Sequence, residues 1–215
     1  MAEAVIWDFG GVFTSSPFEA FNRYETERGL PLDIIRTINA TNPEANAWAK
    51  FEQAVVDLDG FDRLFAEEAK GRGHHIPGRD VLTLLSGDFR PDVIEALRRV
   101  KAAGLKTGCI TNNMPSNPTD GTSTASRSLY SREIMVMFDE VIESSKIGIR
   151  KPDPRIYQLM CDALKVAPPA CVYLDDLGVN LKPAKQLGMT TIKVLSGPQA
   201  VADLEAATGL LLHQY

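Results

Sequence analysis

Short apolar strands and amphipathic helices alternate along most of the chain, and this order constrains the fold more than any other feature. Residues 91–103 carry apolar side chains at helical spacing, and the apolar run 105–110 follows them. The same order returns with a helical stretch over 154–164 and an apolar run over 172–174. Strands that alternate with helices form a parallel sheet covered on both faces. The sequence therefore predicts an α/β fold with a doubly wound parallel sheet, which the apolar run 4–7 enters as a further strand.

A second region has a different texture. Its aromatic and aliphatic residues, such as Trp48 and Phe51, recur three and four positions apart, and no run in it alternates with a period of two. This spacing is typical of amphipathic helices. We therefore expect a small all-helical domain formed by residues 16–90 and an α/β core formed by residues 1–15 and 91–215.

Composition excludes several classes of protein. The 215 residues include 28 acidic and 23 basic side chains, and the net charge of −5 argues against nucleic acid as a partner. No apolar run approaches the roughly 20 residues that span a bilayer, and the N-terminus lacks the pattern of a signal peptide. The three cysteines, Cys109, Cys161 and Cys171, fit neither a zinc site nor a disulfide framework. We expect a cytoplasmic protein with no membrane partner.

Polar residues stand where the predicted strands end. Asp8 follows the first strand, Thr111 and Asn112 follow the strand over 105–110, and Asp175 and Asp176 follow the strand over 172–174. Ligands of an open parallel sheet bind beyond the carboxyl ends of its strands. These five residues are therefore candidates for one site. The Ser- and Thr-rich segment 114–131 that comes next is expected to be a surface loop.

Three carboxylates at one edge of a sheet repel each other and need positive charge to stay ionised together. Lys151, in a Pro-rich turn before the helix over 154–164, supplies one charge. A hard divalent cation such as Mg²⁺, which prefers oxygen ligands, would supply the rest. A single acid of this kind more often only caps a loop or helix, but three together fit that interpretation poorly.

Four segments, in this order, resemble the four motifs of the haloacid dehalogenase-like superfamily. They are Val5-Ile6-Trp7-Asp8-Phe9-Gly10-Gly11-Val12, Cys109-Ile110-Thr111-Asn112-Asn113, Lys151-Pro152, and Leu174-Asp175-Asp176-Leu177-Gly178-Val179-Asn180. The runs 146–157 and 180–189 are similar to one branch in particular. That branch contains the N-terminal phosphatase domain of soluble epoxide hydrolase and relatives fused to acyl-CoA dehydrogenases.

The resemblance implies a Rossmann-like core with a helical cap, here residues 16–90, that closes the site and selects the substrate. It implies that Asp8 is the nucleophile and forms an aspartyl-phosphate. It also implies that Mg²⁺ is bound by the Asp8 carboxylate, the Gly10 carbonyl and Asp176.

The remaining motif residues would act on the phosphoryl group. The resemblance implies that Thr111, Asn112 and Lys151 bind it. Asp175 would orient Lys151 or the water shell of the metal, and Asn180 would support these groups. The catalytic residues implied are therefore Asp8, Thr111, Lys151 and Asp175.

One departure from the family pattern concerns Gly10. Phosphatases of this superfamily usually have a second Asp two residues after the nucleophile, where it acts as general acid and base. Such catalysis typically contributes about 10²- to 10⁴-fold. We therefore expect a good leaving group, another proton donor or a slow reaction. His74 and His75 could donate, but a solvated loop is the favoured position for them.

Three functions follow from these residues. The favoured one is a Mg²⁺-dependent phosphatase, a monomer or homodimer, that acts on a small phosphorylated metabolite. The second is a phosphate-binding regulatory module that has lost turnover. The third is a metal-free 2-haloacid dehalogenase, against which Asp175 and Asp176 count, as does Val12 where dehalogenases usually have Thr.

Overall fold

The computed structural model describes residues 2–85, 87–112 and 125–212. At its centre lies a five-stranded parallel sheet in the order β3-β2-β1-β4-β5. The strands are β1 (Ala4–Trp7), β2 (Lys106–Thr111), β3 (Glu140–Glu143), β4 (Cys171–Asp175) and β5 (Thr190–Lys193). From β1 the chain continues to β2 on one side, and from β4 it continues to β5 on the other side. The winding direction of the sheet therefore changes between the neighbouring strands β1 and β4. Ligand crevices form at such a point.

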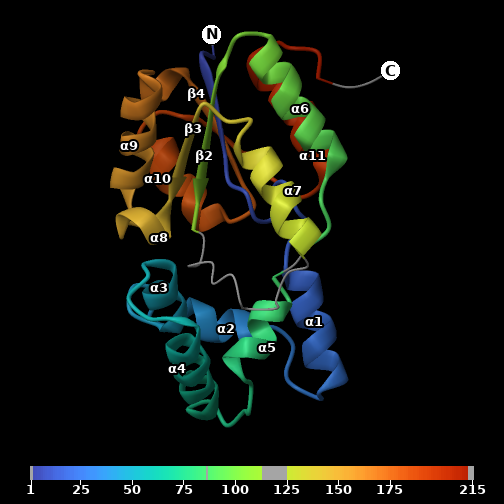
Figure 1. The fold of residues 1–215 in the computed structure, drawn as a ribbon, viewed down its shortest axis with the longest axis vertical. Helices are drawn as coiled ribbons and strands as arrows, with labels where there is room; N and C mark the ends of the chain where they lie inside the picture. Colours follow the sequence, from blue (N-terminus) through green and yellow to red (C-terminus); the bar gives the residue numbers. More distant parts are fainter. Residues whose placement is uncertain (1, 86, 113–124, 213–215) are drawn as a thin grey trace.

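Helices cover both faces of this sheet (Figure 1), and the predicted fold class is confirmed. One face carries α6 (Pro91–Ala102), α7 (Ala125–Met135) and α11 (Gly197–Thr208). The other carries α8 (Ser144–Ile147), α9 (Pro154–Leu164), the short 3₁₀ turn η1 (Pro168–Ala170) and α10 (Gly178–Gln186). We call the strands and these helices the sheet region.

The alternation of side chains along β1 explains why both faces are covered. Val5 and Trp7 pack in the cluster with α6 and α11, whereas Ala4 and Ile6 pack in the cluster with α9. All four residues are fully buried. A strand that is apolar on both faces is stable only at the centre of a covered sheet.

The five helices between residues 18 and 83 form a second hydrophobic core, and we call them the helical region. They are α1 (Phe18–Glu27), α2 (Ile34–Ala40), α3 (Ala47–Glu52), α4 (Leu58–Lys70) and α5 (Gly78–Thr83). Phe61 lies at the centre of this core, with ring centroids 4.8 Å from Phe51 and 5.0 Å from Trp48. Figure 1 shows the helical region at the end of the sheet toward which the strands point.

Two crossing segments connect the regions. Thr14 and Phe89 form an isolated antiparallel bridge, and Ser15 N donates to Asp88 O at 2.7 Å. Gly87 allows this close crossing, because a Cβ atom there would lie 2.2 Å from Ser15 O.

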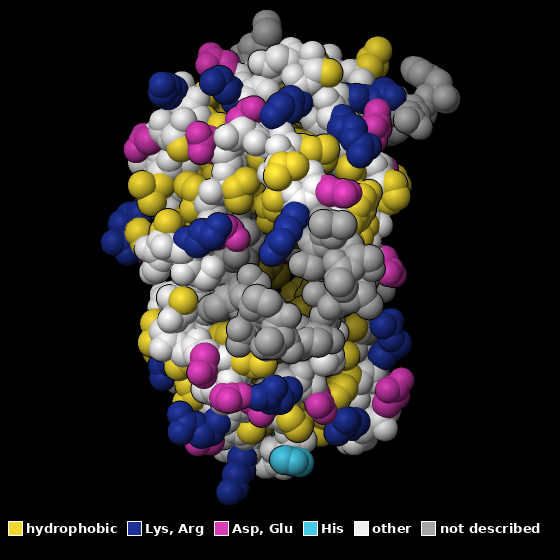
Figure 2. Space-filling model, viewed as in Figure 1, with side chains coloured by type: hydrophobic (Ala, Val, Ile, Leu, Met, Phe, Trp, Pro, Cys, Tyr) yellow, Lys and Arg dark blue, Asp and Glu magenta, His cyan; other side chains and the backbone are white. Residues whose placement is uncertain are grey.

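The surface is mixed in charge. Figure 2 shows positive and negative side chains interspersed among the described residues of the face in view. None of the helices in the described ranges combines the length and apolar character needed to cross a bilayer.

Candidate active site

Asp8 stands at the carboxyl end of the central strand. Its backbone N–H donates to Leu174 O at 2.8 Å, which extends the pairing of β1 with β4 by one residue. Its Oδ1 accepts from Phe9 N at 2.6 Å and lies 2.8 Å from Lys151 Nζ. The residue is only 8% exposed. Burial raises the pKa of Asp8, and its ion pair with Lys151 opposes that rise.

Lys151 bridges two of the acids. Its Nζ lies 2.8 Å from Asp8 Oδ1 and 2.9 Å from Asp175 Oδ2, and the residue is 1% exposed. Burial acts to lower the pKa of Lys151, but Asp175 and Asp8 outweigh it and raise the pKa above its usual value. Lys151 is therefore a fixed positive charge in the middle of the site.

Asn112 holds the backbone of Lys151 from the neighbouring strand. Its Oδ1 accepts from Lys151 N at 2.8 Å, and its Nδ2 donates to Lys151 O at 3.0 Å. Thr111, the last residue of β2, is buried beside it. The structure thus brings Thr111, Asn112 and Lys151 together, with the amide of Asn112 bonded to the lysine backbone.

Asp175 has donors on both of its oxygens. Lys151 Nζ, the Tyr173 hydroxyl at 2.5 Å and Leu177 N at 2.8 Å donate to it, and Asn180 Nδ2 lies 3.1 Å from each oxygen. A fully bonded carboxylate has little capacity left for a metal ion. Asp175 therefore anchors Lys151, and the Tyr173 hydroxyl is a contact that the apolar strand pattern gave no reason to expect.

Asp176 faces the other side of the cluster. Its Oδ2 accepts a long 3.2 Å bond from Ser16 Oγ, in the segment that leads to the helical region. Burial and the charge of Asp175 raise the pKa of Asp176 to about 6, while Lys151 and Ser16 lower it. Oxygens of Asp8, Asp175 and Asp176 all lie within 4.8 Å of one another.

The donor set fits a hard cation such as Mg²⁺. Asp8 and Asp176 offer carboxylate oxygens, which this ion prefers, and within the described parts of the chain no donor bonds Asp8 Oδ2. The three carboxylates of the cluster also outnumber the single ammonium of Lys151, so the cluster is short of positive charge. Asp8 and Asp176 are therefore the residues suited to hold the ion, and Asp175 is not.

The two glycines after Asp8 differ sharply. Gly11 has a φ of +75°, and a Cβ atom there would lie 2.2 Å from Asp176 Oδ2. Gly10 has no left-handed backbone, and an added Cβ would meet nothing within 4 Å. Gly11 thus leaves room for Asp176 against the loop, a requirement that sequence reasoning missed although the Gly-Gly pair was its signal.

Three other predicted features lie elsewhere. The turn between α4 and α5, which contains His74 and His75, lies at the end of the helical region remote from the sheet (Figure 1). Most of the predicted loop 114–131 lies outside the described residues. Its last part is not a loop, because residues 125–131 begin α7, where Ile134 farther along packs into the sheet core.

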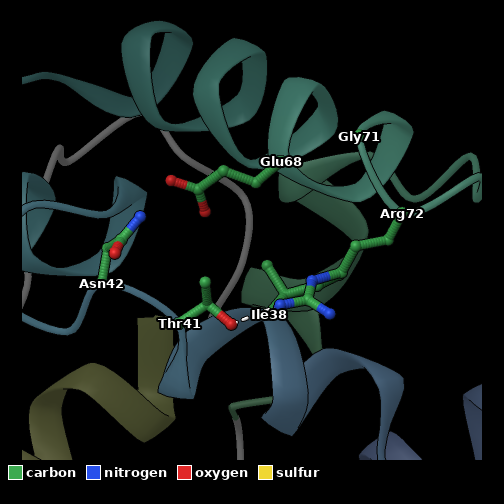
Figure 3. A pocket seen from close by; sticks show the side chains of 6 residues that line it. All are labelled: Ile38, Thr41, Asn42, Glu68, Gly71 and Arg72. Carbon is green, nitrogen blue, oxygen red and sulfur yellow. Dashed lines mark hydrogen bonds between the residues drawn. The ribbon is translucent and has the colours of Figure 1, made fainter.

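A hollow of about 380 Å³ in the helical region contains none of the predicted site residues. In Figure 3 the Glu68 carboxylate points into it, and Arg72 lies beside Thr41, to whose Oγ1 it donates. It is lined by Ile38, Thr41, Asn42, Glu68, Gly71 and Arg72.

Comparison with known proteins identifies similar sequences over most of the chain. A family model described as haloacid dehalogenase-like hydrolase matches residues 2–188. The chain is 34% identical to acyl-CoA dehydrogenase family member 10 of Mus musculus over 98% of its length, and 41% identical to bifunctional epoxide hydrolase 2 of Sus scrofa over 57%. It spans only 19% and 21% of those two proteins. It is also 29% identical to a phosphatase of Mycobacterium tuberculosis, covering 97% of this chain and 96% of that protein.

Solved structures show the same fold. A HAD family enzyme of Bacteroides thetaiotaomicron in complex with magnesium and inorganic phosphate matches with a TM-score of 0.59 at 14% identity, over 90% of this chain and 94% of that one. A dehalogenase matches with a TM-score of 0.65 at 18% identity, over 98% of each chain. At sequence identities this low, the structural similarity shows a shared fold and does not show a shared function.

Proposed function

This chain belongs to the haloacid dehalogenase-like hydrolase family, as its motifs predicted, and we propose that it is a Mg²⁺-dependent phosphatase of a small phosphorylated metabolite. One observation carries the proposal. The buried Asp8 carboxylate lies at the winding switch of the sheet, bonded to a lysine that Asp175 anchors and Asn112 holds, with Asp176 opposite. The phosphatase among the relatives supports the same activity.

In the proposed reaction Asp8 is the nucleophile. A carboxylate oxygen of Asp8 forms a bond to phosphorus as the bond between phosphorus and the ester oxygen breaks, which releases the leaving group and gives an aspartyl-phosphate. Water then attacks phosphorus, the bond to Asp8 breaks, and inorganic phosphate leaves. Asp8 is regenerated as a carboxylate.

Lys151, Thr111 and Asn112 would bind the phosphoryl oxygens, where negative charge concentrates as the group is transferred. Asp8, the Gly10 carbonyl and Asp176 would hold Mg²⁺, which when bound neutralises phosphoryl charge beside three carboxylates. The domain formed by residues 16–90 would act as a cap over the core formed by residues 1–15 and 91–215. This cap would exclude water and select the substrate.

Gly10 limits the substrates. No carboxyl group two residues after Asp8 can protonate a departing alkoxide, so we expect aryl and acyl phosphates to react faster than simple alkyl esters. The same residue favours the second candidate, a module that binds phosphate without turnover.

A hydrolysis assay separates these candidates. We expect the protein to hydrolyse p-nitrophenyl phosphate with Mg²⁺ and to lose this activity in EDTA. Binding of inorganic phosphate with no hydrolysis of aryl or acyl phosphates would favour the regulatory module. Release of halide from a 2-haloacid in EDTA would favour the dehalogenase.

A further inference from the structure

A group of polar contacts joins the helical region to the segment that carries Lys151. Arg150 Nη2 lies 2.7 Å from Glu52 Oε2, at the end of α3. Arg150 Nη1 donates to Pro43 O at 2.6 Å, and Ser144 Oγ donates to Glu52 O at 2.8 Å. These contacts span about a hundred residues of sequence, so they arise only from the way the two regions pack.

The Glu52–Arg150 pair is unusually buried. Its side chains are 14% and 17% exposed, whereas every other ion pair of the described residues, apart from the two of Lys151, has a partner at least 33% exposed. Burial raises the pKa of Glu52 to about 7, while Arg150 and Lys151 lower it. Removing two charges from water offsets most of the attraction between them. A gain in stability is therefore a weak explanation for the pair, and a geometric role is a better one.

The backbone around Lys151 is fixed by contacts from two directions. Asn112 bonds its N–H and C=O from the sheet, and Arg150, the adjacent residue, is bonded to the helical region. The Lys151 ammonium then reaches Asp8 and Asp175. A displacement of α3 would thus act first on Arg150 and next on the lysine at the reacting carboxylate.

We propose that Glu52 is a positioning residue that, through Arg150, holds Lys151 against Asp8 when the helical region covers the site. The helical region then contributes to the rate of phosphoryl transfer as well as to substrate choice. The kinetic part of this inference rests on the proposed phosphatase function, whereas the structural part does not.

Glu52→Gln tests the inference, because it removes the charge and keeps the size. Misplacement of a catalytic group by about 1 Å can cost about 100-fold in rate. We expect kcat for p-nitrophenyl phosphate to fall about 10- to 100-fold with KM changed less than about threefold. Arg28→Gln is the matched control, since it breaks the ion pair with Asp80 inside the helical region. It should leave kcat unchanged.

Amide hydrogen exchange provides a readout that needs no turnover. Residues 144–153 should exchange faster in Glu52→Gln than in the parent and in Arg28→Gln. If the parent hydrolyses no phosphate ester, the proposed function fails, and the exchange comparison still decides whether Glu52 holds this segment.

The outcomes that overturn the inference are specific. Unchanged amide hydrogen exchange over 144–153 in Glu52→Gln would overturn it. A lower melting temperature with an unchanged kcat would also overturn it, because this result indicates that Glu52 only stabilises the fold. If Glu52→Gln does not fold, Arg150→Lys carries the same test, because it keeps the charge and loses the planar fork that forms the ion pair with Glu52 and donates to Pro43. The same changes in kcat and exchange, but smaller, are then expected.

Discussion

The sheet region and the helical region are built on different principles. In the sheet region the three candidate carboxylates and the pair Thr111 and Asn112 stand where topology places them, at the carboxyl ends of β1, β4 and β2. Lys151 instead lies in the turn before α9, and its ammonium reaches Asp8 and Asp175 from there. The helical region is held by an aromatic core, and its polar contacts with the site come through a few residues such as Glu52. From this comparison we expect the chemistry to reside at the strand ends, and access and alignment to depend on how a separate core packs.

The largest expected effect lies in the sheet region, with Asp8→Asn. The amide keeps the size of the carboxylate and can still accept a bond from Lys151, but it cannot act as the nucleophile. We expect phosphate release to fall to the uncatalysed background, measured with p-nitrophenyl phosphate. The melting temperature should stay near that of the parent, and Asp59→Asn, at an exposed acid of the helical region, should retain full activity. Turnover near the parent rate would make Asp8 a ligand only.

The second prediction compares the two glycines after Asp8. Gly10→Asp restores a carboxyl group where the chain has room for a side chain. It should raise kcat/KM for alkyl phosphates by about 10²-fold relative to aryl phosphates, because only alkoxides need the proton. Gly11→Ala is the contrast, since strain at positive φ and a collision with Asp176 should remove the stabilisation by Mg²⁺. A parent enzyme equally fast on both ester types would show that another group already donates the proton.

A third prediction separates the two cores. Phe61→Ala opens a cavity among Trp48, Phe51 and Phe65 and should destabilise the helical region by about 3–5 kcal/mol. Amide hydrogen exchange should become faster across α1–α5, and KM should increase. Mg²⁺ should still slow amide hydrogen exchange in the sheet region. Leu97→Ala, which truncates an α6 side chain in the core between α6 and the sheet, should instead speed amide hydrogen exchange around the sheet. Equal effects of both variants on both regions would mean that they unfold as one unit.

Sequence patterns predicted the sheet region better than the contacts between the regions. The parallel sheet, the strand-end positions of Asp8 and Asp176, and helix 154–164 all follow from local periodicity, and the structure contains them. Periodicity carries no information about long-range polar bonds, so it missed Asn112 on the Lys151 backbone and the Glu52–Arg150 pair. The catalytic and metal-binding roles stay predictions, because proximity does not establish a role.

The smallest expected effect concerns Asp176 and pH. Its pKa in the folded protein is raised from 3.8 to about 6, so the folded state holds this proton more tightly than the unfolded chain does. The resulting contribution to stability is fully present below pH 4 and is lost as the pH rises through about 6. If Asp176 holds Mg²⁺ as proposed, the ion would bind the ionised carboxylate and oppose that loss.

The increase in melting temperature caused by Mg²⁺ should therefore be small at pH 5 and should grow to a plateau above pH 7, in a thermal scan at constant ionic strength. Asp176→Ala should abolish both the increase and its pH dependence, whereas Asp59→Ala should change neither. A Mg²⁺ effect that is the same at pH 5 and pH 8, or that persists in Asp176→Ala, would remove Asp176 from the metal site. The cation would then have to be held without this carboxylate, and Asp176 would serve to bond Ser16 and the segment that leads to the helical region.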